Sequence, residues 1–376
     1  MKKAILFALV IAVAGSAIAQ KKVMKAARSE YNDKHYEKAY ELIQTAKDND
    51  ESKVMPETWI VRGKILQAIA KDSALSAKFE NPLIEAFKSY SKAIEIEPKA
   101  KNEVNLLMLE FTGISTKIGA NAYNTKNYEK AYDYFELTLK AEESPIFAKS
   151  IDTTIIFYSG MAALKSLKYD KAIEQFNKAI SYKYNGAYSY SVLKDAYMQK
   201  GDTATGLATL KKAFETYPND LTVIIDLINY YLQTGQPNEA LNYLNMAKQK
   251  DPNNASYWFA EGTLYEKMKQ PDNAVVSYVK ATELNPKNLN AFFNLGVLFF
   301  NNGVEINKQA TNENDNFKYG ELIKKRDEEF KKAIPYFEKA HALSPKDEDI
   351  AKSLKSIYVN LQMDDKVKEL KAEMNW

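Results

Sequence analysis

The sequence offers few of the side chains that enzymes use most often for chemistry. It contains no cysteine, and its two histidines are His35 and His341. A thiolate nucleophile, a disulfide and a cysteine-liganded metal are therefore excluded, as is a histidine-rich metal centre. His35 stands at an expected turn, before Tyr36, and His341 lies on an expected helix, after Ala340. We interpret both histidines as surface residues rather than as ligands.

Carboxylates are abundant, but none stands in a recognisable catalytic or metal-binding motif. The phosphate-binding loop, the dinucleotide-binding loop, the serine-hydrolase elbow and the zincin helix motif are all missing from the sequence. The acidic run at 48–51 lacks the glycine and the closing glutamate of a calcium loop. We therefore predict that the protein is not an enzyme and that it needs no cofactor and no metal.

Composition and charge favour a folded, mostly helical chain with no affinity for nucleic acid. The 376 residues include 13 glycines and 11 prolines, fewer than turn-rich all-β folds need. Apolar residues make up 45% and charged residues 27%, which is typical of a folded soluble chain. Basic and acidic residues number 52 and 49, and no concentrated basic face is visible. We predict no nucleic-acid partner.

The N-terminal segment, 1–19, has the features of a secretory signal peptide. Met1-Lys2-Lys3 forms a basic head, residues 4–14 form an apolar core, and residues 15–19 are mostly small. The alternative is a retained membrane anchor, but the apolar run is shorter than the roughly 20 residues of a spanning helix. We expect cleavage after Ala19 and export, to the periplasm if the source has two membranes. No later segment is apolar enough to span a bilayer, so any membrane association would pass through a partner.

The elements that must position any functional side chain are set by an internal repeat. Ala172, Gly206, Ala240 and Ala274, which we call anchors, follow one another at one constant interval along the chain. Matching residues stand at fixed distances from these anchors: Ala179, Ala213, Ala247 and Ala281 seven after, Pro218, Pro252 and Pro286 twelve after, and Tyr197, Tyr231 and Tyr265 nine before. Chance does not produce this regularity, so the repeat predicts one structural unit used many times.

The repeat extends in both directions with altered spacing. Further anchors are Ala39, Ala86, Ala131 and Ala333, which gives about eight units over residues 20–346. Longer gaps indicate insertions near 68–81 and 301–328, and we interpret the second, asparagine-rich insertion as a solvated hairpin tip rather than a partner contact. Residues 347–376 are expected to form helices that cap the array.

Each unit reads as two amphipathic helices joined by a turn. Apolar residues recur at helical spacing over 221–234, and Gly235 to Asn238 then supply a turn. Gly63, Gly119, Gly160, Gly262 and Gly296 lie inside expected first helices, at a cost of about 1 kcal/mol each. We expect each of these glycines to lie opposite an anchor alanine, because two helices approach closely only where side chains are small. Lys194 and Ile228 replace the glycine in two units, where we expect a wider separation.

These spacings resemble the tetratricopeptide repeat (TPR), a 34-residue unit with the signature W-x2-L-G-x2-Y…A-x3-F…P. Trp258, Gly262, Tyr265, Ala274, Tyr278 and Pro286 follow that signature, with Glu261 in place of its leucine. The resemblance covers roughly nine tenths of the expected mature chain. It implies an all-α fold, a right-handed superhelical solenoid of TPR helix hairpins.

The resemblance also implies which residues face a partner, because one helix of each TPR unit lines the inside of the superhelix. These positions stand 18, 15, 11 and 8 residues before each anchor, with equivalent positions in the last unit. The resulting candidates for partner binding are Phe157, Met161, Tyr188, Ile225, Asn229, Phe259, Phe293 and Phe300. Apolar side chains on such a surface suit a helix or an extended segment of a partner. The alternative is that these residues bury one another in the core.

We therefore predict a non-catalytic exported TPR scaffold that binds a peptide or protein partner on its concave face. One alternative is a structural spacer subunit of an envelope complex. The other is an enzyme subunit that uses carboxylates on the inner face or around Asp315.

Overall fold

The computed structural model describes residues 22–148 and 150–376, and every regular element in these two ranges is helical. The predicted signal peptide at 1–19 lies outside the described residues. Within the described ranges, no helix combines the length and the apolar character that crossing a membrane requires. The predicted all-α repeat solenoid of helix hairpins is confirmed, whereas its right-handed coiling stays a prediction.

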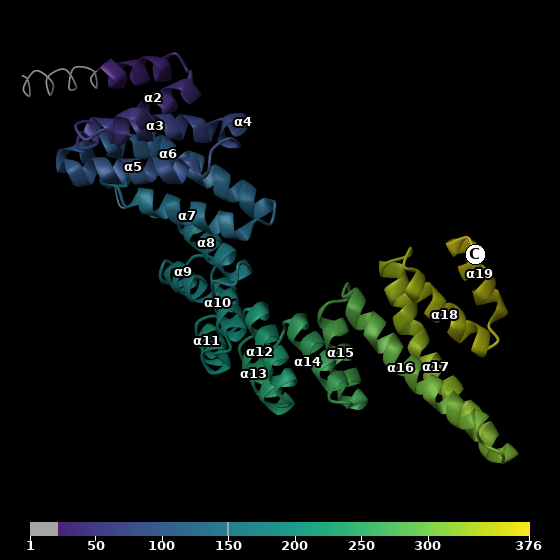
Figure 1. The fold of residues 1–376 in the computed structure, drawn as a ribbon. Helices are drawn as coiled ribbons and strands as arrows, with labels where there is room; N and C mark the ends of the chain where they lie inside the picture. The colour runs from purple at the N-terminus through teal and green to yellow at the C-terminus, as the bar shows by residue number, and fades with distance from the viewer. Residues whose placement is uncertain (1–21, 149) are drawn as a thin grey trace, which may run out of the picture. The chain divides into compact units, whose positions relative to one another are not determined.

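The chain divides into two compact units, the first ending at Asp202 and the second running from Thr203 to Trp376. In the first unit a helix over 22–32 is followed by a regular succession of helices (Figure 1). These are α2 (Tyr36–Asp48), α3 (Pro56–Lys71), α4 (Ser73–Ser76), α5 (Pro82–Ile96), α6 (Lys101–Asn124), α7 (Tyr128–Glu142), α8 (Thr153–Lys165), α9 (Tyr169–Ser181) and α10 (Ala187–Lys200), with 3-10 turns at Pro98–Ala100 and Pro145–Phe147.

The second unit continues the alternation of first and second helices. Its helices are α11 (Thr203–Thr216), α12 (Leu221–Gln233), α13 (Pro237–Lys250), α14 (Ala255–Lys267), α15 (Pro271–Leu284), α16 (Leu289–Thr311), α17 (Asn316–Leu343), α18 (Glu348–Asn360) and α19 (Asp364–Met374). Figure 1 shows α16 and α17 side by side as a long hairpin. The insertion at 301–328 is therefore mostly helical, because it lengthens both helices and leaves only a short turn at its centre.

Short-range chemistry sets where these helices begin. The carboxylates of Asp152 and Asp220 accept hydrogen bonds from backbone N–H groups at the starts of α8 and α12, and Asn254 caps α14 in the same way. Pro237 and Pro271 occupy the first turns of α13 and α15, where a missing N–H costs nothing. The turn predicted at Gly235 to Asn238 therefore lies at the junction of α12 and α13.

The anchors lie at the centre of each helix pair. All seven alanine anchors have 0% exposure, and so do the alanines seven residues after the anchors. The largest fully buried side chains include Tyr90, Phe176, Tyr278 and Phe337, each four residues after an anchor. The repeat in the sequence is thus a repeat of core positions.

The glycines meet aromatic rings, so the expectation that each lies opposite an anchor alanine is wrong. A methyl group at Gly262 would lie 2.5 Å from Cδ1 of Tyr278, and one at Gly160 would lie 2.8 Å from Cε1 of Phe176. The pairs are Gly63 with Tyr90, Gly119 with Phe135, Gly160 with Phe176, Gly262 with Tyr278, and Gly296 with Phe337. Glycine is needed because the ring lies directly on the backbone of the facing helix.

The same contact recurs inside the second insertion, where the sequence analysis did not look for it. A methyl group at Gly303 on α16 would lie 2.6 Å from the ring of Phe330 on α17. Gly303 is seven residues after Gly296, and Phe330 is seven before Phe337. The lengthened hairpin is therefore packed by a second copy of the glycine–aromatic contact, two helical turns further along.

Candidate functional site

In the first unit the predicted binding residues lie on α8 and α10. Phe157 has 3% exposure, and its ring centroid lies 5.8 Å from that of Phe176 and 5.4 Å from that of Tyr184. Phe157 therefore lies in the core of the first unit, which is the alternative that the sequence analysis left open. Met161 is half-buried, and Tyr188 is 48% exposed.

In the second unit the predicted residues divide between exposed and half-buried positions. Ile225, which is 42% exposed, and Asn229 lie on the exposed side of α12. Phe259 and Phe293 are half-buried, and each lies against the aromatic residue that covers the glycine of its own hairpin, Tyr278 at 5.5 Å and Phe337 at 5.8 Å. Phe300 is half-buried as well and stacks on Phe330 at 5.6 Å.

Helical geometry explains why these phenylalanines lie partly in the core. Phe157, Phe259 and Phe293 each stand three residues before a glycine, and residues three apart share one face of a helix. A ring that covers the glycine therefore touches the phenylalanine as well. The face that carries these phenylalanines therefore overlaps the packing face of the helix.

The first unit gathers further tyrosines that the sequence analysis did not select. Tyr123 at the end of α6 lies 5.6 Å from Tyr158 on α8 and 5.4 Å from Tyr128 at the start of α7, measured between ring centroids. Phe157 lies 5.8 Å from Tyr158 and 5.8 Å from Tyr188. We call Tyr123, Tyr128, Tyr158, Tyr184 and Tyr188, with Phe157 beneath them, the tyrosine surface.

The sequence contained a signal for part of this surface. Tyr123 stands eight residues before Ala131, one of the inner-face positions that the resemblance implied, and Tyr158 follows Phe157 directly. Tyr158 is 40% exposed. Burial raises the pKa of the Tyr123 hydroxyl, and Tyr128, Tyr158 and Tyr188 act in the same direction, which places these four tyrosines close together.

A polar cluster occupies the corresponding part of the second unit. The Tyr278 hydroxyl donates a hydrogen bond to a carboxylate oxygen of Glu266 and accepts one from the Asn294 side chain at 3.0 Å. Thr263, from α14, lies 3.2 Å from the same hydroxyl. Burial, followed by the bond to Glu266, raises the pKa of Tyr278. These polar groups satisfy one another, so the cluster fixes the Tyr278 ring against Gly262.

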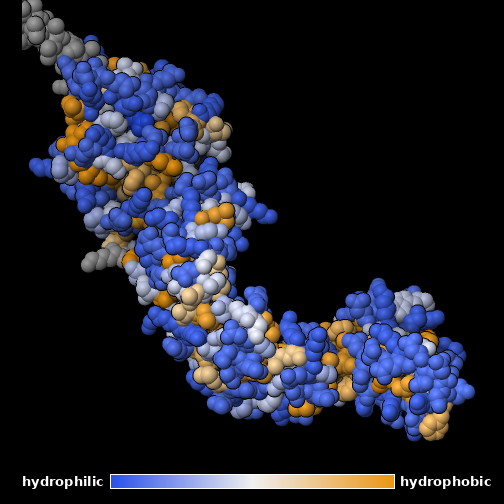
Figure 2. Space-filling view, turned by 60° about the horizontal axis from the view of Figure 1, so that its bottom comes forward, coloured by the Kyte–Doolittle hydropathy of each residue, from blue (hydrophilic) through white to orange (hydrophobic). Residues whose placement is uncertain are grey.

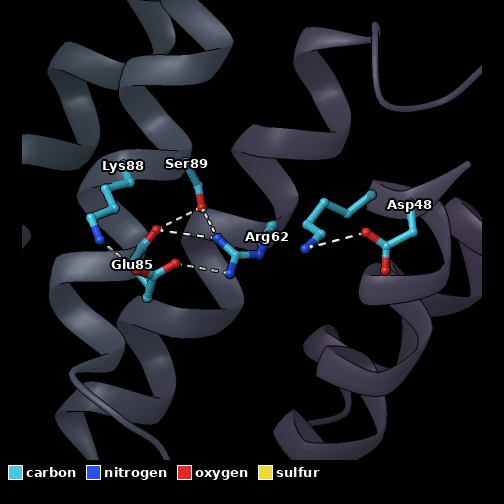
Figure 3. A network of polar contacts seen from close by, with 6 residues as sticks. Asp48, Arg62, Glu85, Lys88 and Ser89 are labelled. Atoms are coloured by element: carbon cyan, nitrogen blue, oxygen red, sulfur yellow. Dashed lines mark hydrogen bonds and ion pairs between the residues drawn. The ribbon is translucent and has the colours of Figure 1, made fainter. Parts of the chain in front are cut away.

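Two carboxylates, Glu85 and Asp315, make structural contacts. Arg62 on α3 donates hydrogen bonds to Glu85 Oε2 at 3.2 Å and to Ser89 Oγ at 2.5 Å, and Lys88 Nζ lies 2.8 Å from Glu85 Oε1 (Figure 3). Lys88, and after it Arg62, lowers the pKa of Glu85, opposite to the shift that a general acid needs. Asp315 caps α17 by accepting from the N–H groups of Phe317 and Lys318.

Two surface hollows in the first unit have polar linings. One of about 380 Å³ is lined by Tyr40, Arg62, Phe79 and Glu85, among others. A larger one of about 540 Å³ lies between the helix over 22–32, α3 and α6, where Lys64 pairs with Glu103 at 2.6 Å and Lys71 with Glu110 at 2.7 Å. The wall of each hollow contains an ion pair of the protein itself, Arg62 with Glu85 in the first and Lys71 with Glu110 in the second. The visible face of the molecule is mostly hydrophilic, with apolar residues in separate patches (Figure 2).

Comparison with known families identifies repeats in the second half of the chain. Residues 197–261 match a family described as tetratricopeptide repeat, and residues 269–303 match one described as TPR repeat. The first segment ends directly before Gly262, and the second includes Gly296. The positions matched are therefore those that form the helix pairs described above.

One curated protein and several solved structures are similar to parts of the chain. FK506-binding protein 5 of Rhizopus delemar is 31% identical over 155 residues, which are 40% of this chain and 38% of that protein. A TPR repeats protein from Bacteroides fragilis is 25% identical, with a TM-score of 0.33, over 66% of this chain and 98% of that one. The C-terminal part of a TPR repeat-containing protein from Cytophaga hutchinsonii is 15% identical, with a TM-score of 0.41, over 69% of this chain and 93% of that one.

Proposed function

Because this chain is a tetratricopeptide repeat protein, we propose that it is a non-catalytic scaffold whose first helices bind a peptide or protein partner. The observation that carries this proposal is the exposure of large apolar side chains on those helices. Tyr158 on α8, Tyr188 on α10 and Ile225 on α12 are each at least 40% exposed. Counted back from the anchors of their own units, their positions differ by at most four residues. Apolar side chains that gather on one surface, unlike singly exposed ones, are typical of protein interaction sites.

The surface proposed for the second unit combines exposed and half-buried residues. Ile225 and Asn229 supply the accessible part, and the half-buried rings of Phe259, Phe293 and Phe300 supply apolar edges. An extended or helical segment that places apolar side chains at regular spacing suits this kind of surface. Phe157 is left out, because its ring is enclosed.

We also propose that the protein acts outside the cytoplasm. The support is the basic head, the apolar core and the small-residue end of residues 1–19. N-terminal sequencing of protein recovered from the fractionated source is the test. A chain that begins at Gln20 is expected, and a chain that retains Met1 would remove this part of the proposal.

Site-specific photocrosslinking tests partner binding. A photoreactive amino acid at Ile225 or Asn229 on α12 is expected to give adducts with peptide or protein from the native source. The matched controls are Met246 on α13 and Val276 on α15, which are 48% and 66% exposed but lie on second helices.

The pattern of adducts decides between the scaffold and its alternatives. Adducts from α12 positions that greatly exceed those from Met246 and Val276 support binding by first helices. Equal yields from both sets, or adducts from the second helices alone, overturn the proposal. The spacer alternative predicts adducts from the second helices alone, because a spacer would contact its neighbours through the outer surface that the second helices form.

A further inference from the structure

We propose that the tyrosine surface of the first unit binds proline-rich segments in the polyproline II conformation. This inference rests on the proposed function and names the class of partner for one part of it. Its argument depends on accessible ring area, ring arrangement, free hydroxyl groups and local charge.

The first step is accessible aromatic area. Tyr158 and Tyr188 are 40% and 48% exposed, and Tyr123, Tyr128 and Tyr184 are half-buried. Phe157 lies beneath them and contacts Tyr158, Tyr184 and Tyr188. These contacts with Phe157 restrict the positions open to three of the rings. Rigid tyrosines offer large contact area at low entropic cost.

The second step is the arrangement of the rings. Tyr123 meets Tyr158 at 81° and Tyr128 at 71°, and Phe157 meets Tyr158 at 87°. Tyr184 and Tyr188 are tilted against Phe157 at 48° and 44°. Rings that are nearly perpendicular make alternating ridges and notches instead of a flat platform. A polyproline II helix has three residues per turn, so its pyrrolidine rings form regularly spaced ridges along one edge. Aromatic-lined surfaces recognise such segments in several unrelated protein classes.

The third step is the hydroxyl groups. Within the described part of the chain, the hydroxyls of Tyr123, Tyr158 and Tyr188 make no hydrogen bond, whereas the buried Tyr278 hydroxyl is fully engaged. A polyproline II segment has no internal hydrogen bonds, so its carbonyl oxygens need external donors. Proline has no N–H, which leaves such a segment with acceptors alone. Tyrosine hydroxyls supply the donors that these carbonyls need.

The fourth step is charge. Besides burial, the groups that raise the pKa of the Tyr123 hydroxyl are Tyr128, Tyr158 and Tyr188. Glu129, which follows Tyr128, is paired with Lys168 at 3.3 Å. Asp195, at the equivalent inner-face position of α10, is paired with Lys194 at 2.7 Å. An uncharged partner segment is therefore favoured over an acidic or a basic one, because a charged segment would lose hydration without gaining a counter-charge.

Direct titration of the full chain tests the inference. The probe is a fluorescent polyproline peptide of about ten residues, roughly three turns of polyproline II. A Gly-Ser peptide of equal length and a linear glucose oligosaccharide are the comparison ligands. We expect the polyproline peptide to bind at least about tenfold more tightly than either, a difference of about 1.4 kcal/mol.

Variants tie the binding to these residues. Tyr158→Ser with Tyr188→Ser is expected to weaken polyproline binding by at least about tenfold, because central aromatic residues dominate such interfaces. Tyr158→Phe with Tyr188→Phe keeps the rings and is expected to lose less, since only the hydroxyl donors are removed. Tyr319→Ser, which removes a tyrosine of 46% exposure from α17, is the control and should bind as the unaltered chain does.

Each result bears on the inference in a stated direction. Equal affinity for the Gly-Ser peptide, or tyrosine-dependent binding of the oligosaccharide instead, overturns the proline-rich assignment. Polyproline binding that survives both serine substitutions, in variants whose circular dichroism matches the unaltered chain, overturns the location. If either of these results is found while crosslinks at Ile225 still form, the proline-rich inference fails and the proposed scaffold function does not. Failure of the inference can therefore be distinguished from failure of the proposed function.

Discussion

At the scale of single residues, the glycine–aromatic contact holds each helix pair together. The ring of Tyr278 lies so close to Gly262 that no Cβ fits between them. The ring cannot shift easily, because its hydroxyl is bound to Glu266 and Asn294 and lies beside Thr263. Glycine is therefore required here by packing, although it is a poor helix former.

Gly262→Ala is expected to destabilise the protein. Overpacking costs about 1–3 kcal/mol, which exceeds the gain of about 1 kcal/mol from the better helix former. Gly113→Ala on α6 is the matched control, because nothing lies within 4 Å of the position its methyl group would take. Urea unfolding should move to lower midpoint for Gly262→Ala and to higher midpoint for Gly113→Ala. Stabilisation by both substitutions would contradict the packing role.

The Arg62 network gives a second prediction at this scale. The Arg62 side chain is 8% exposed, so Glu85→Gln leaves a buried guanidinium beside a neutral amide. Lys88→Gln removes an exposed partner of the same carboxylate and should cost less than about 1 kcal/mol. Urea denaturation at pH 7 is expected to rank Glu85→Gln as the more destabilising of the two. Equal losses would show that Arg62 does not depend on Glu85.

The pH dependence of this difference follows from the lowered pKa of Glu85. The folded protein favours the ionised carboxylate, so the stability it contributes is present above the ordinary value of 4.5. That contribution is lost as the pH falls through the lower pKa of the folded state. The gap in unfolding midpoint between the unaltered chain and Glu85→Gln should therefore narrow below about pH 4.5. A gap that widens in acid would contradict the assigned direction.

The sequence predicted which residues recur, but not always which way they face. The anchors were expected at contacts between helices and are buried, and they could be found because the constant period of the repeat is visible without coordinates. The burial of Phe157 could not be predicted, because a residue three positions before Gly160 can lie either on the packing face or at its edge. Only contact with Phe176 and Tyr184 decides between them.

At the scale of helices, the ends could be predicted better than the lengths. Asp, Asn and Pro mark the starts of α12 to α16 by local hydrogen bonding or by the absence of an N–H. The extension of α16 into the insertion, as far as Thr311, was missed, because its stabilising contact joins Gly303 to Phe330, which is distant in the sequence. Long-range contacts of this kind override local preference.

Asp315 supplies a prediction at the scale of one helix. Its carboxylate accepts from the backbone N–H groups of Phe317 at 2.9 Å and Lys318 at 3.0 Å. Asp315→Ala is expected to cost about 1 kcal/mol and to fray the start of α17. Hydrogen exchange of the Phe317 and Lys318 amides should accelerate in that variant. Asp315→Asn keeps an acceptor and should retain protection, and equal exchange in both variants would contradict the capping role.

At the scale of the whole molecule, the boundary between the compact units does not follow the repeat read from the sequence. That repeat pairs α10 with α11, whereas the boundary between Asp202 and Thr203 separates them. Within the first unit, Val192, Leu193 and Ala196 of α10 share a core with Ala172 and Phe176 of α9. Lys194 stands where other first helices carry the glycine that their partner ring covers. Helix α10 therefore packs on α9, the helix before it.

Two truncations test this boundary. A fragment covering 20–202 keeps α10 on α9, and a fragment covering 20–186 removes it and exposes the faces of Ala172 and Phe176 that α10 covers. Because each helix of a repeat array is stabilised mainly by its neighbours, the longer fragment should unfold at a higher urea concentration and with a steeper transition. The complementary fragments, 203–376 and 187–376, provide the control: if α10 is stabilised by the first unit alone, their unfolding midpoints should agree. The opposite result would be a higher urea midpoint for 187–376 than for 203–376, with equal midpoints for 20–202 and 20–186. That result would show that α10 folds with α11, and that the sequence repeat rather than the compact unit is the folding module.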